Sequence, residues 1–237
     1  MTDEGLKSED WQGEHAFGEG WFAFRGRASD NAPHAHAAVQ LTASRLEKVS
    51  IETKPGGVVC GSALIVRAGV HHRLLPCREA VLILIEPAAA AARGLRGEGA
   101  IATLDYTVAH ALTKDGPLGE VVTEALGLIS NQNDGDERLR AALGMLTAAS
   151  HGTLADLSRA VGLSEARLRA LAKRDLGVPL TKVAGYHRLA RAAEVIADGA
   201  SLAEAAAAAG FADQAHLTRT FKAMIGLTPG AASTPLR

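Results

Sequence analysis

The first half of the chain alternates short apolar segments with glycine, proline and asparagine, a pattern that indicates strands separated by turns. The expected strands cover residues 21–25, 38–42, 45–53, 62–66 and 80–85. Many short strands at close spacing are typical of a β-sandwich or a small β-barrel. The pattern therefore predicts a β-rich N-terminal domain.

Helical periodicity replaces this pattern after residue 86. Residues 88–95 are expected to form a helix, and residues 117–130 carry an apolar stripe with i, i+3, i+4 and i+7 spacing. The stripe consists of Leu118, Val121, Val122, Ala125, Leu126 and Ile129. Because such a stripe has to be buried, we expect it either to pack on the strands or to pair with its copy in a second chain.

From residue 136 onward the strong signals are all helical. Thr153 is a candidate N-cap, and Asp156 stands at the capping-box distance from it. Gly162 permits a sharp turn, and Ser164 caps the helix that follows. A capped helix, a glycine turn and a second capped helix are typical of a helix-turn-helix.

The same arrangement recurs about 48 residues later. Ser201 is the cap, Gly210 is the turn and Asp213 caps the next helix. Residues 179–198 between the two copies are expected to form one long connecting helix. An internal repeat of a helix-turn-helix is more informative than either copy alone.

The chain has 237 residues, enough for one or two domains, and its net charge of −1 is unevenly divided. Up to residue 133 there are 12 Lys and Arg against 16 Asp and Glu, and after it 13 against 10. This change of sign favours a second module that tolerates a polyanion. We expect a sensor domain at 1–116, a dimerisation helix and linker at 117–134, and a DNA-binding domain at 135–237.

Two cysteines, neither in a C-x-x-C pair, are too few for a disulfide framework or a cysteine-rich zinc module. No apolar run approaches the roughly 20 residues needed to cross a bilayer, and the first ten residues are polar and acidic. We therefore expect a cytoplasmic protein that makes no membrane contact.

Histidines in the first half suggest a metal site. His34 and His36 form an H-x-H motif, Gln40 follows four residues later, and His72 lies after a glycine turn. This pattern resembles the two half-motifs of the cupin superfamily, which implies a double-sheet barrel whose mouth holds a metal on these side chains. Three imidazoles and one oxygen suit zinc, nickel, iron or manganese. The alternative is that the histidines simply line a polar pocket.

The second repeat carries a further resemblance. Residues 209–222 and 226–229 resemble the signature of the AraC family of transcriptional regulators almost residue for residue. The resemblance implies an α+β protein in which a cupin-like β-barrel precedes an all-α domain with two helix-turn-helix motifs. It also implies promoter DNA as a partner, with RNA polymerase as a possible one, a small-molecule or metal effector, and a homodimer.

The positions expected to face DNA lie off the buried side of each second helix, where a helix fits the major groove. Glutamine can pair with adenine, arginine with guanine, and lysine or threonine with phosphate. The expected DNA-binding residues are Glu165, Ala166, Arg167, Arg169 and Lys173 in the first repeat, and Gln214, His216, Thr218, Arg219 and Lys222 in the second.

Motifs of the common catalytic families are missing from the sequence, including G-x-S-x-G, the Walker loop and H-E-x-x-H. We therefore expect a regulator and no enzyme. The alternative is a metal-dependent cupin enzyme with a helical appendage, since histidine-bound metals activate water or oxygen. Gln40 weakens that alternative because it stands where a carboxylate base is expected.

Overall fold

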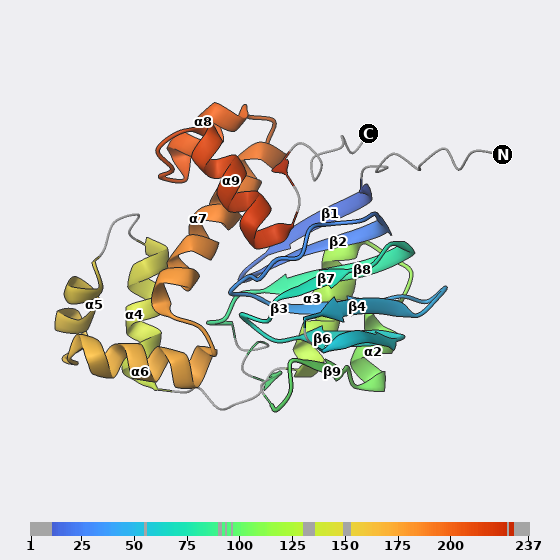
Figure 1. Cartoon of the computed structure of the whole chain (residues 1–237), viewed down its shortest axis with the longest axis horizontal. Coiled ribbons are helices and arrows are strands. Elements are labelled where there is room, and N and C mark those ends of the chain that lie inside the picture. The colour runs from blue at the N-terminus through green and yellow to red at the C-terminus, as the bar shows by residue number, and fades with distance from the viewer. Residues whose placement is uncertain are drawn as a thin grey trace.

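The computed structural model describes residues 11–54, 56–89, 92, 94, 95, 97–129, 136–148, 153–226, 228 and 229. A β-rich N-terminal domain is followed by a helical domain with two helix-turn-helix motifs, which confirms the expected fold class (Figure 1). Residues 130–134 of the expected dimerisation helix and linker, and part of the expected helix at 88–95, lie outside the described residues.

The strands of the N-terminal domain form two sheets. The larger sheet has the order β1 (Gln12–Gly18), β2 (Trp21–Ala28), β8 (Cys77–Ile85), β3 (Val39–Ala43), β6 (Ala63–Val66) and β9 (Ile101–Thr103). The smaller sheet has the order β5 (Gly57–Gly61), β4 (Val49–Thr53) and β7 (His72–Leu74). All pairings within the sheets are antiparallel.

The central strands of the larger sheet are buried on both faces, and residues 80–85 of β8 are apolar at every position. On β8, Leu82 and Leu84 belong to the core shared with the smaller sheet, whereas Ile83 and Ile85 belong to a second core beneath two helices. Successive side chains of a strand point to opposite faces, so one continuous apolar run serves both cores. The helices of the second core are α2 (Tyr106–Leu112) and α3 (Leu118–Ile129).

The apolar stripe of α3 is buried against the sheet of its own chain. Its residues Leu118, Val122, Ala125 and Leu126 are part of the second core, so the first of the two expected packings is the one observed. The outer side of α3 exposes Leu128 to 52%. Pairing of α3 with a second copy stays a prediction, and it would have to use this outer side.

The helical domain contains α4 (Glu137–Ala148), α5 (Leu154–Ala160), α6 (Glu165–Leu176), α7 (Leu180–Ala197), α8 (Leu202–Ala208) and α9 (Gln214–Ile225). Thr153 and Ser201 each form a complete capping box, and Ser164 and Asp213 cap α6 and α9. Gly162 and Gly210 make the two turns with φ of 64° and 72°, a left-handed conformation that costs other residues about 1–2 kcal/mol. The expected caps and turns are therefore confirmed.

Four strands were not expected from the sequence: β1, β5, β7 and β9. β5 carries exposed Val58 and Val59 between glycines, and β7 and β9 have only three residues each, too few for periodicity to be visible. Each of these strands is paired along its whole length with a neighbouring strand. Among the described residues, no helix is both long and apolar enough to span a membrane.

Candidate nucleic-acid interface and ligand sites

Helix α6 presents a cationic outer side. Leu168, Leu171 and Ala172 bury its inner side in the helical core. The outer side exposes Ala166, Arg167, Arg169 and Lys173, while Glu165 is half-buried. Arg169 forms an ion pair with Glu165 at 2.6 Å, and the Lys173 ammonium donates to the carbonyl oxygen of Gly177 at 2.7 Å. Exposed contacts of this kind are weak and can be exchanged for phosphate.

Helix α9 has the same construction. Leu217, Phe221 and Met224 are buried, and Gln214, Arg219 and Lys222 are exposed. Within the described part of the chain, neither Arg219 nor Lys222 has an ion-pair partner, and the same holds for Arg167 on α6. Thr218 is half-buried.

His216 is held by its own domain. Its ring stands edge-on to Phe211 with a centroid distance of 5.3 Å, and its Nδ1 accepts from the Ala212 backbone N–H at 3.4 Å. The guanidinium of Arg188 lies over the other ring of this pair, 5.3 Å from the Phe211 centroid. In this conformation His216 supports the turn of the second motif, and only part of its ring is available to a ligand.

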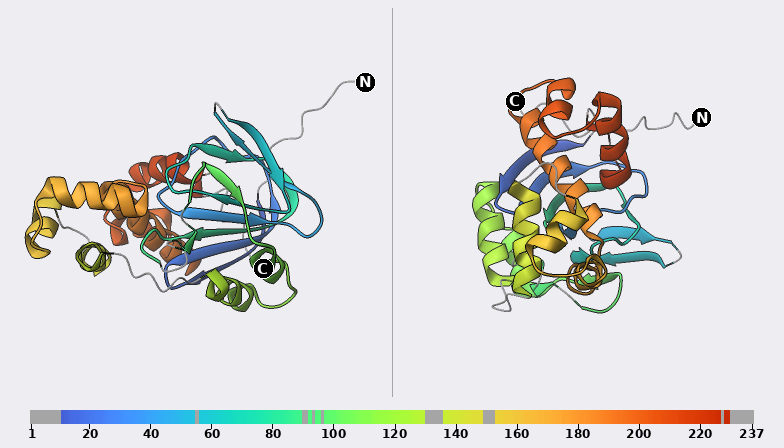
Figure 2. Two further views of the ribbon diagram at one scale, coloured as in Figure 1. Left: turned by 90° about the horizontal axis from the view of Figure 1, so that it is seen from below. Right: turned by 90° about the vertical axis from the view of Figure 1, so that its left-hand side faces the viewer.

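The two recognition helices lie on the same side of α7, and α4 lies on the other side (Figure 2). Their axes are not parallel: the right-hand view of Figure 2 shows α6 end-on and α9 from the side. Major grooves one turn apart on B-DNA are related by a translation, so two helices seated alike in them have parallel axes. The observed placement therefore differs from the one that successive grooves require.

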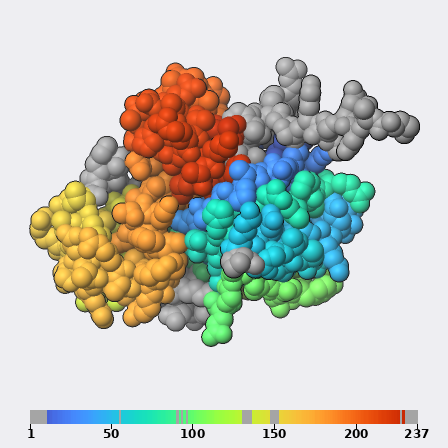
Figure 3. All heavy atoms as spheres, viewed as in Figure 1, coloured from blue at the N-terminus to red at the C-terminus, as the bar shows by residue number. Residues whose placement is uncertain are grey.

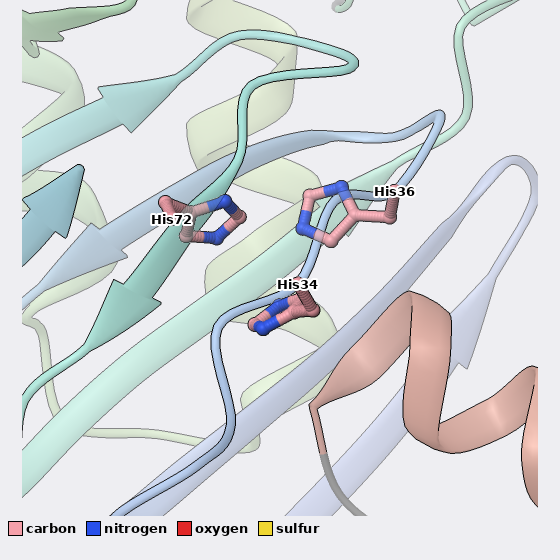
Figure 4. A group of neighbouring side chains, drawn as sticks. All are labelled: His34, His36 and His72. Carbon is pink, nitrogen blue, oxygen red and sulfur yellow. The ribbon is translucent and has the colours of Figure 1, made fainter. Parts of the chain in front are cut away.

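The histidine cluster lies inside the N-terminal domain. His34 and His36 precede β3, Gln40 lies on β3, and His72 begins β7 in the other sheet. The rings of His34, His36 and His72 point toward one another (Figure 4), and one nitrogen of each lies within 4.8 Å of the others. The H-x-H segment is not part of a strand, and a single antiparallel bridge pairs His34 with His72.

Each histidine has one ring nitrogen fixed by a backbone carbonyl. The Nδ1 atoms of His34, His36 and His72 lie 2.9, 2.9 and 3.0 Å from the carbonyl oxygens of Ala32, Ala38 and Val70. A carbonyl oxygen only accepts, so Nδ1 carries the hydrogen in all three rings. A neutral imidazole has one N–H, and each Nε2 is left with a free lone pair.

These lone pairs face a further electron-rich atom. Gln40 Oε1 lies 3.2 Å from His36 Nε2 and 3.1 Å from His72 Nε2, while the Gln40 amide nitrogen donates to Thr42 Oγ1 at 2.9 Å. A cation bound between these acceptor atoms would compensate the repulsion between their lone pairs. Without a cation, a 180° turn of the Gln40 amide would pair the same lone pairs, because the NH₂ group would then donate to both His36 and His72.

Burial keeps the cluster uncharged at neutral pH. Loss of hydration, with the charge of neighbouring histidines as a smaller cause, lowers the pKa of His34 to about 4 and that of His72 to about 3. Burial also lowers the pKa of His36. Neutral imidazoles are the form that binds metals, and a backbone acceptor on the second nitrogen is the usual support of a metal-binding histidine.

A cavity of about 390 Å³ adjoins the cluster and separates the two domains. Aromatic and aliphatic side chains of β1, β2 and β8 form one wall, and α7 and α9 close the other. Its lining includes Trp11, Asn31, Phe22, Tyr186, Arg191 and Phe221, and the cavity also reaches His34, His36 and Gln40. His187 on α7 lies 3.1 Å from Glu86 after β8 and links the two walls.

Among the residues that line this cavity, three buried polar atoms have no hydrogen-bond partner in the described structure: Trp11 Nε1, Asn31 Oδ1 and His187 Nε2. His187 Nε2 lies beside the Glu86 carboxylate, so Trp11 and Asn31 are the two without any polar neighbour in these contacts. These two residues are only 9% and 7% exposed. Buried polar groups nearly always have a hydrogen-bond partner. Unpaired groups that line a cavity therefore indicate that a ligand or a water molecule forms the missing hydrogen bonds. The volume falls in the range of small-molecule sites.

Residues 157–234 match a family model described as a helix-turn-helix domain. This part of the chain is an AraC-type helix-turn-helix domain. Comparison with curated protein sequences gave no match.

The AraC-type domain and the β-rich domain together have the fold of ToxT from Vibrio cholerae. The structure of ToxT from strain O395 is 9% identical, with a TM-score of 0.59, over 92% of this chain and 100% of ToxT. ToxT from strain SCE256 with a bound unsaturated fatty acid is 10% identical, with a TM-score of 0.57, over 88% and 93% of the two chains. At this identity the likeness concerns the fold.

Sequence reasoning missed the cavity and the contacts between the two domains. Trp11 and Arg191 lie far apart in the sequence and belong to no motif, so no local signal connects them. A weak signal existed in the aromatic residues Trp21, Phe22 and Phe24, all three of which line the cavity.

Proposed function

We propose that this protein is a sequence-specific DNA-binding transcriptional regulator whose N-terminal domain holds an effector. The observation that carries the proposal is the pair of recognition helices on one side of α7, each with exposed cations that lack an ion-pair partner among the described residues. Arg167, Arg219 and Lys222 remain available to DNA, and Arg169 and Lys173 can be recruited from weak exposed contacts.

The proposal includes a change of domain arrangement. The face in Figure 3 shows the α9 region lying directly against the N-terminal domain. Because α6 and α9 are not parallel here, binding to successive grooves requires that one of them turn relative to the other. An effector that stabilises one arrangement more than the other shifts this equilibrium and so changes DNA affinity.

Arg219→Ala is the first test. If Arg219 reads a guanine, we expect the substitution to weaken binding to the best duplex selected from a randomised pool by about 1–3 kcal/mol and to relax the preference at one position. Fluorescence anisotropy with the full chain measures this. Arg138→Ala is the matched control, because Arg138 is exposed and belongs to α4, the helix on the opposite side of α7. Equal losses in both variants would contradict the assignment.

The cavity between the domains is the proposed site of a small-molecule effector. Its aromatic walls suit an apolar body, the Trp11 N–H can donate to an acidic head group, and Arg191, which has no ion-pair partner among the described residues, can neutralise it. The fatty acid in the structure of ToxT supports the same class of ligand for a protein of this fold.

Oleic acid serves as the probe for this site. We expect it to raise the melting temperature of the full chain and expect Trp11→Phe to weaken its binding by about tenfold, because the ring is kept while one hydrogen bond of about 1.5 kcal/mol is lost. Isothermal titration calorimetry gives the two affinities. Trp21→Phe, which alters another lining residue whose indole nitrogen is not orphaned, is the control. Identical affinities for wild type and Trp11→Phe would remove the assigned contact.

A divalent transition metal on His34, His36, His72 and Gln40 is the second proposed component. Three imidazole nitrogens and an amide oxygen match zinc, nickel, iron or manganese, and the backbone acceptors already select the correct tautomers. When bound, the ion would supply the positive charge that the converging lone pairs lack. The chain's own contribution is to keep the ligands neutral and pointed at one place.

Elemental analysis of the purified protein tests this component. We expect about one equivalent of metal in the wild type and almost none in His36→Ala, since removal of one of three imidazoles typically abolishes such a site. Gln40→Glu is the informative second variant: an anionic oxygen in place of the amide should raise the affinity for Zn²⁺. Equal metal contents in wild type and His36→Ala would rule the site out.

We propose no enzymatic role for this cluster. The side chain beside the histidines is the amide of Gln40, which cannot take up a proton at neutral pH. The cluster also lies next to the helical domain, where a bound ion has a structural consequence.

A further inference from the structure

The recognition helix α9 ends on the loop that carries the first two histidines. Gly226 caps α9 with a φ of 80°, and its carbonyl oxygen accepts from the Ala32 backbone N–H at 3.0 Å. A Cβ at Gly226 would collide with the Ala32 carbonyl oxygen and lie 2.6 Å from His34 Nδ1. Figure 4 shows the end of this helix beside His34. The helix end and the loop are in contact without room for a methyl group.

The recognition helix α6 ends on the loop that leads to the third histidine. Gly177 caps α6 with a φ of 75°, and the next residue, Val178, is buried. A Cβ at Gly69 would lie 2.9 Å from Val178 Cγ1. The backbone N–H of Gly69 donates to the His36 carbonyl oxygen at 2.8 Å. The end of α6 thus rests on a loop that is bonded to the histidine cluster.

The two loops are also joined to each other. The backbone N–H groups of His34 and His72 each donate to the other residue's carbonyl oxygen at 2.9 Å. The two loops, which we call the helix seats (residues 32–36 and 68–72), therefore form one small unit. Both recognition helices end on this unit, and all three histidines belong to it.

We propose that a metal ion bound by the three histidines locks the helix seats and thereby holds α6 and α9 in their non-parallel placement, so that metal binding weakens DNA binding. This inference rests on the proposed function. An ion would cross-link His34 in one seat with His72 in the other, because one ring nitrogen of each already lies within 4.8 Å of the others. Reorientation of either helix then has to deform a cross-linked unit.

The effect of the metal ion on DNA binding can be measured in both directions, because two ligands of one protein change each other's affinity by the same factor. If the ion favours the non-parallel placement, DNA lowers the affinity for the ion by the same factor by which the ion lowers the affinity for DNA. Couplings between two sites in one protein typically amount to about 5- to 150-fold in affinity. We expect a decrease in DNA affinity in this range when Zn²⁺ saturates the full chain.

The experiment measures the Kd of the full chain for its selected duplex with and without saturating Zn²⁺. The variant is Gly226→Ala, whose methyl group separates the end of α9 from its seat. The matched control is Gly210→Ala, which has the same left-handed strain at a φ of 72° but no atom within 4 Å of the added methyl group. Zn²⁺ affinity and circular dichroism are recorded for each protein.

The expected result is a loss of DNA affinity on adding Zn²⁺ in wild type and Gly210→Ala, and a much smaller loss in Gly226→Ala. Zn²⁺ binding that leaves the wild-type Kd within twofold would overturn the inference while the proposed regulator stands. If Zn²⁺ weakens DNA binding equally in Gly226→Ala, the contact between α9 and the helix seats does not transmit the effect, and the inference fails. A wild-type chain that does not bind Zn²⁺ would also overturn it. A chain that binds no duplex under any condition would instead refute the proposed function.

Discussion

Leu217→Ala is expected to lower the free energy of unfolding by about 2–5 kcal/mol, because a leucine that is completely buried leaves a cavity when it is truncated. Leu217 lies on the inner side of α9 and belongs to the core that the helical domain shares with the inner face of the N-terminal sheets. A loosened α9 also displays Arg219 and Lys222 in many orientations, so specific DNA binding should fall as well.

Urea denaturation of the full chain, followed by circular dichroism, measures the change. Leu128→Ala is the matched control: Leu128 is also a helical leucine, but it is 52% exposed on α3, and its truncation should change stability by less than about 0.5 kcal/mol. If the two variants unfold at the same urea concentration, α9 is not held by the packing described above.

A fourfold increase in salt, from 50 to 200 mM KCl, is expected to weaken DNA binding by about 150-fold. The estimate takes Arg167, Arg169, Lys173 and Lys222 as phosphate contacts and Arg219 as a base contact, which gives a slope of about −3.6 in a plot of log K against log salt. The effect is large because each cation releases counterions from the duplex, although the net charge of the whole chain is only −1.

Anisotropy titrations at four or five salt concentrations give the slope. Lys222→Ala should reduce its magnitude by about one, whereas Arg138→Ala should leave it unchanged. A slope close to zero for the wild type would mean that the exposed cations of α6 and α9 do not meet a phosphate backbone, and it would favour a role in protein interaction.

The helices of the C-terminal domain, and its helix-turn-helix type, could be predicted from the sequence alone. Capping boxes at Thr153 and Ser201, glycine turns at Gly162 and Gly210, and leucines at helical spacing all depend on residues a few positions apart. Such signals can be read directly along the chain because the hydrogen bonds that they predict are local. The apolar runs of β2, β3, β6 and β8 are also visible along the chain, although the hydrogen bonds of these strands join distant residues.

How these elements pack against one another could be learned only from the folded structure. The stripe of α3 could be interpreted either as a sheet contact or as a dimer contact until its place over the sheet was known. The orientation of α9 depends on the contact of Gly226 with Ala32 and His34, and the cavity is lined by Trp11 from one domain and Arg191 from the other. These contacts join residues from opposite ends of the chain, and no period or cap encodes them, because they follow from how finished elements fill space together.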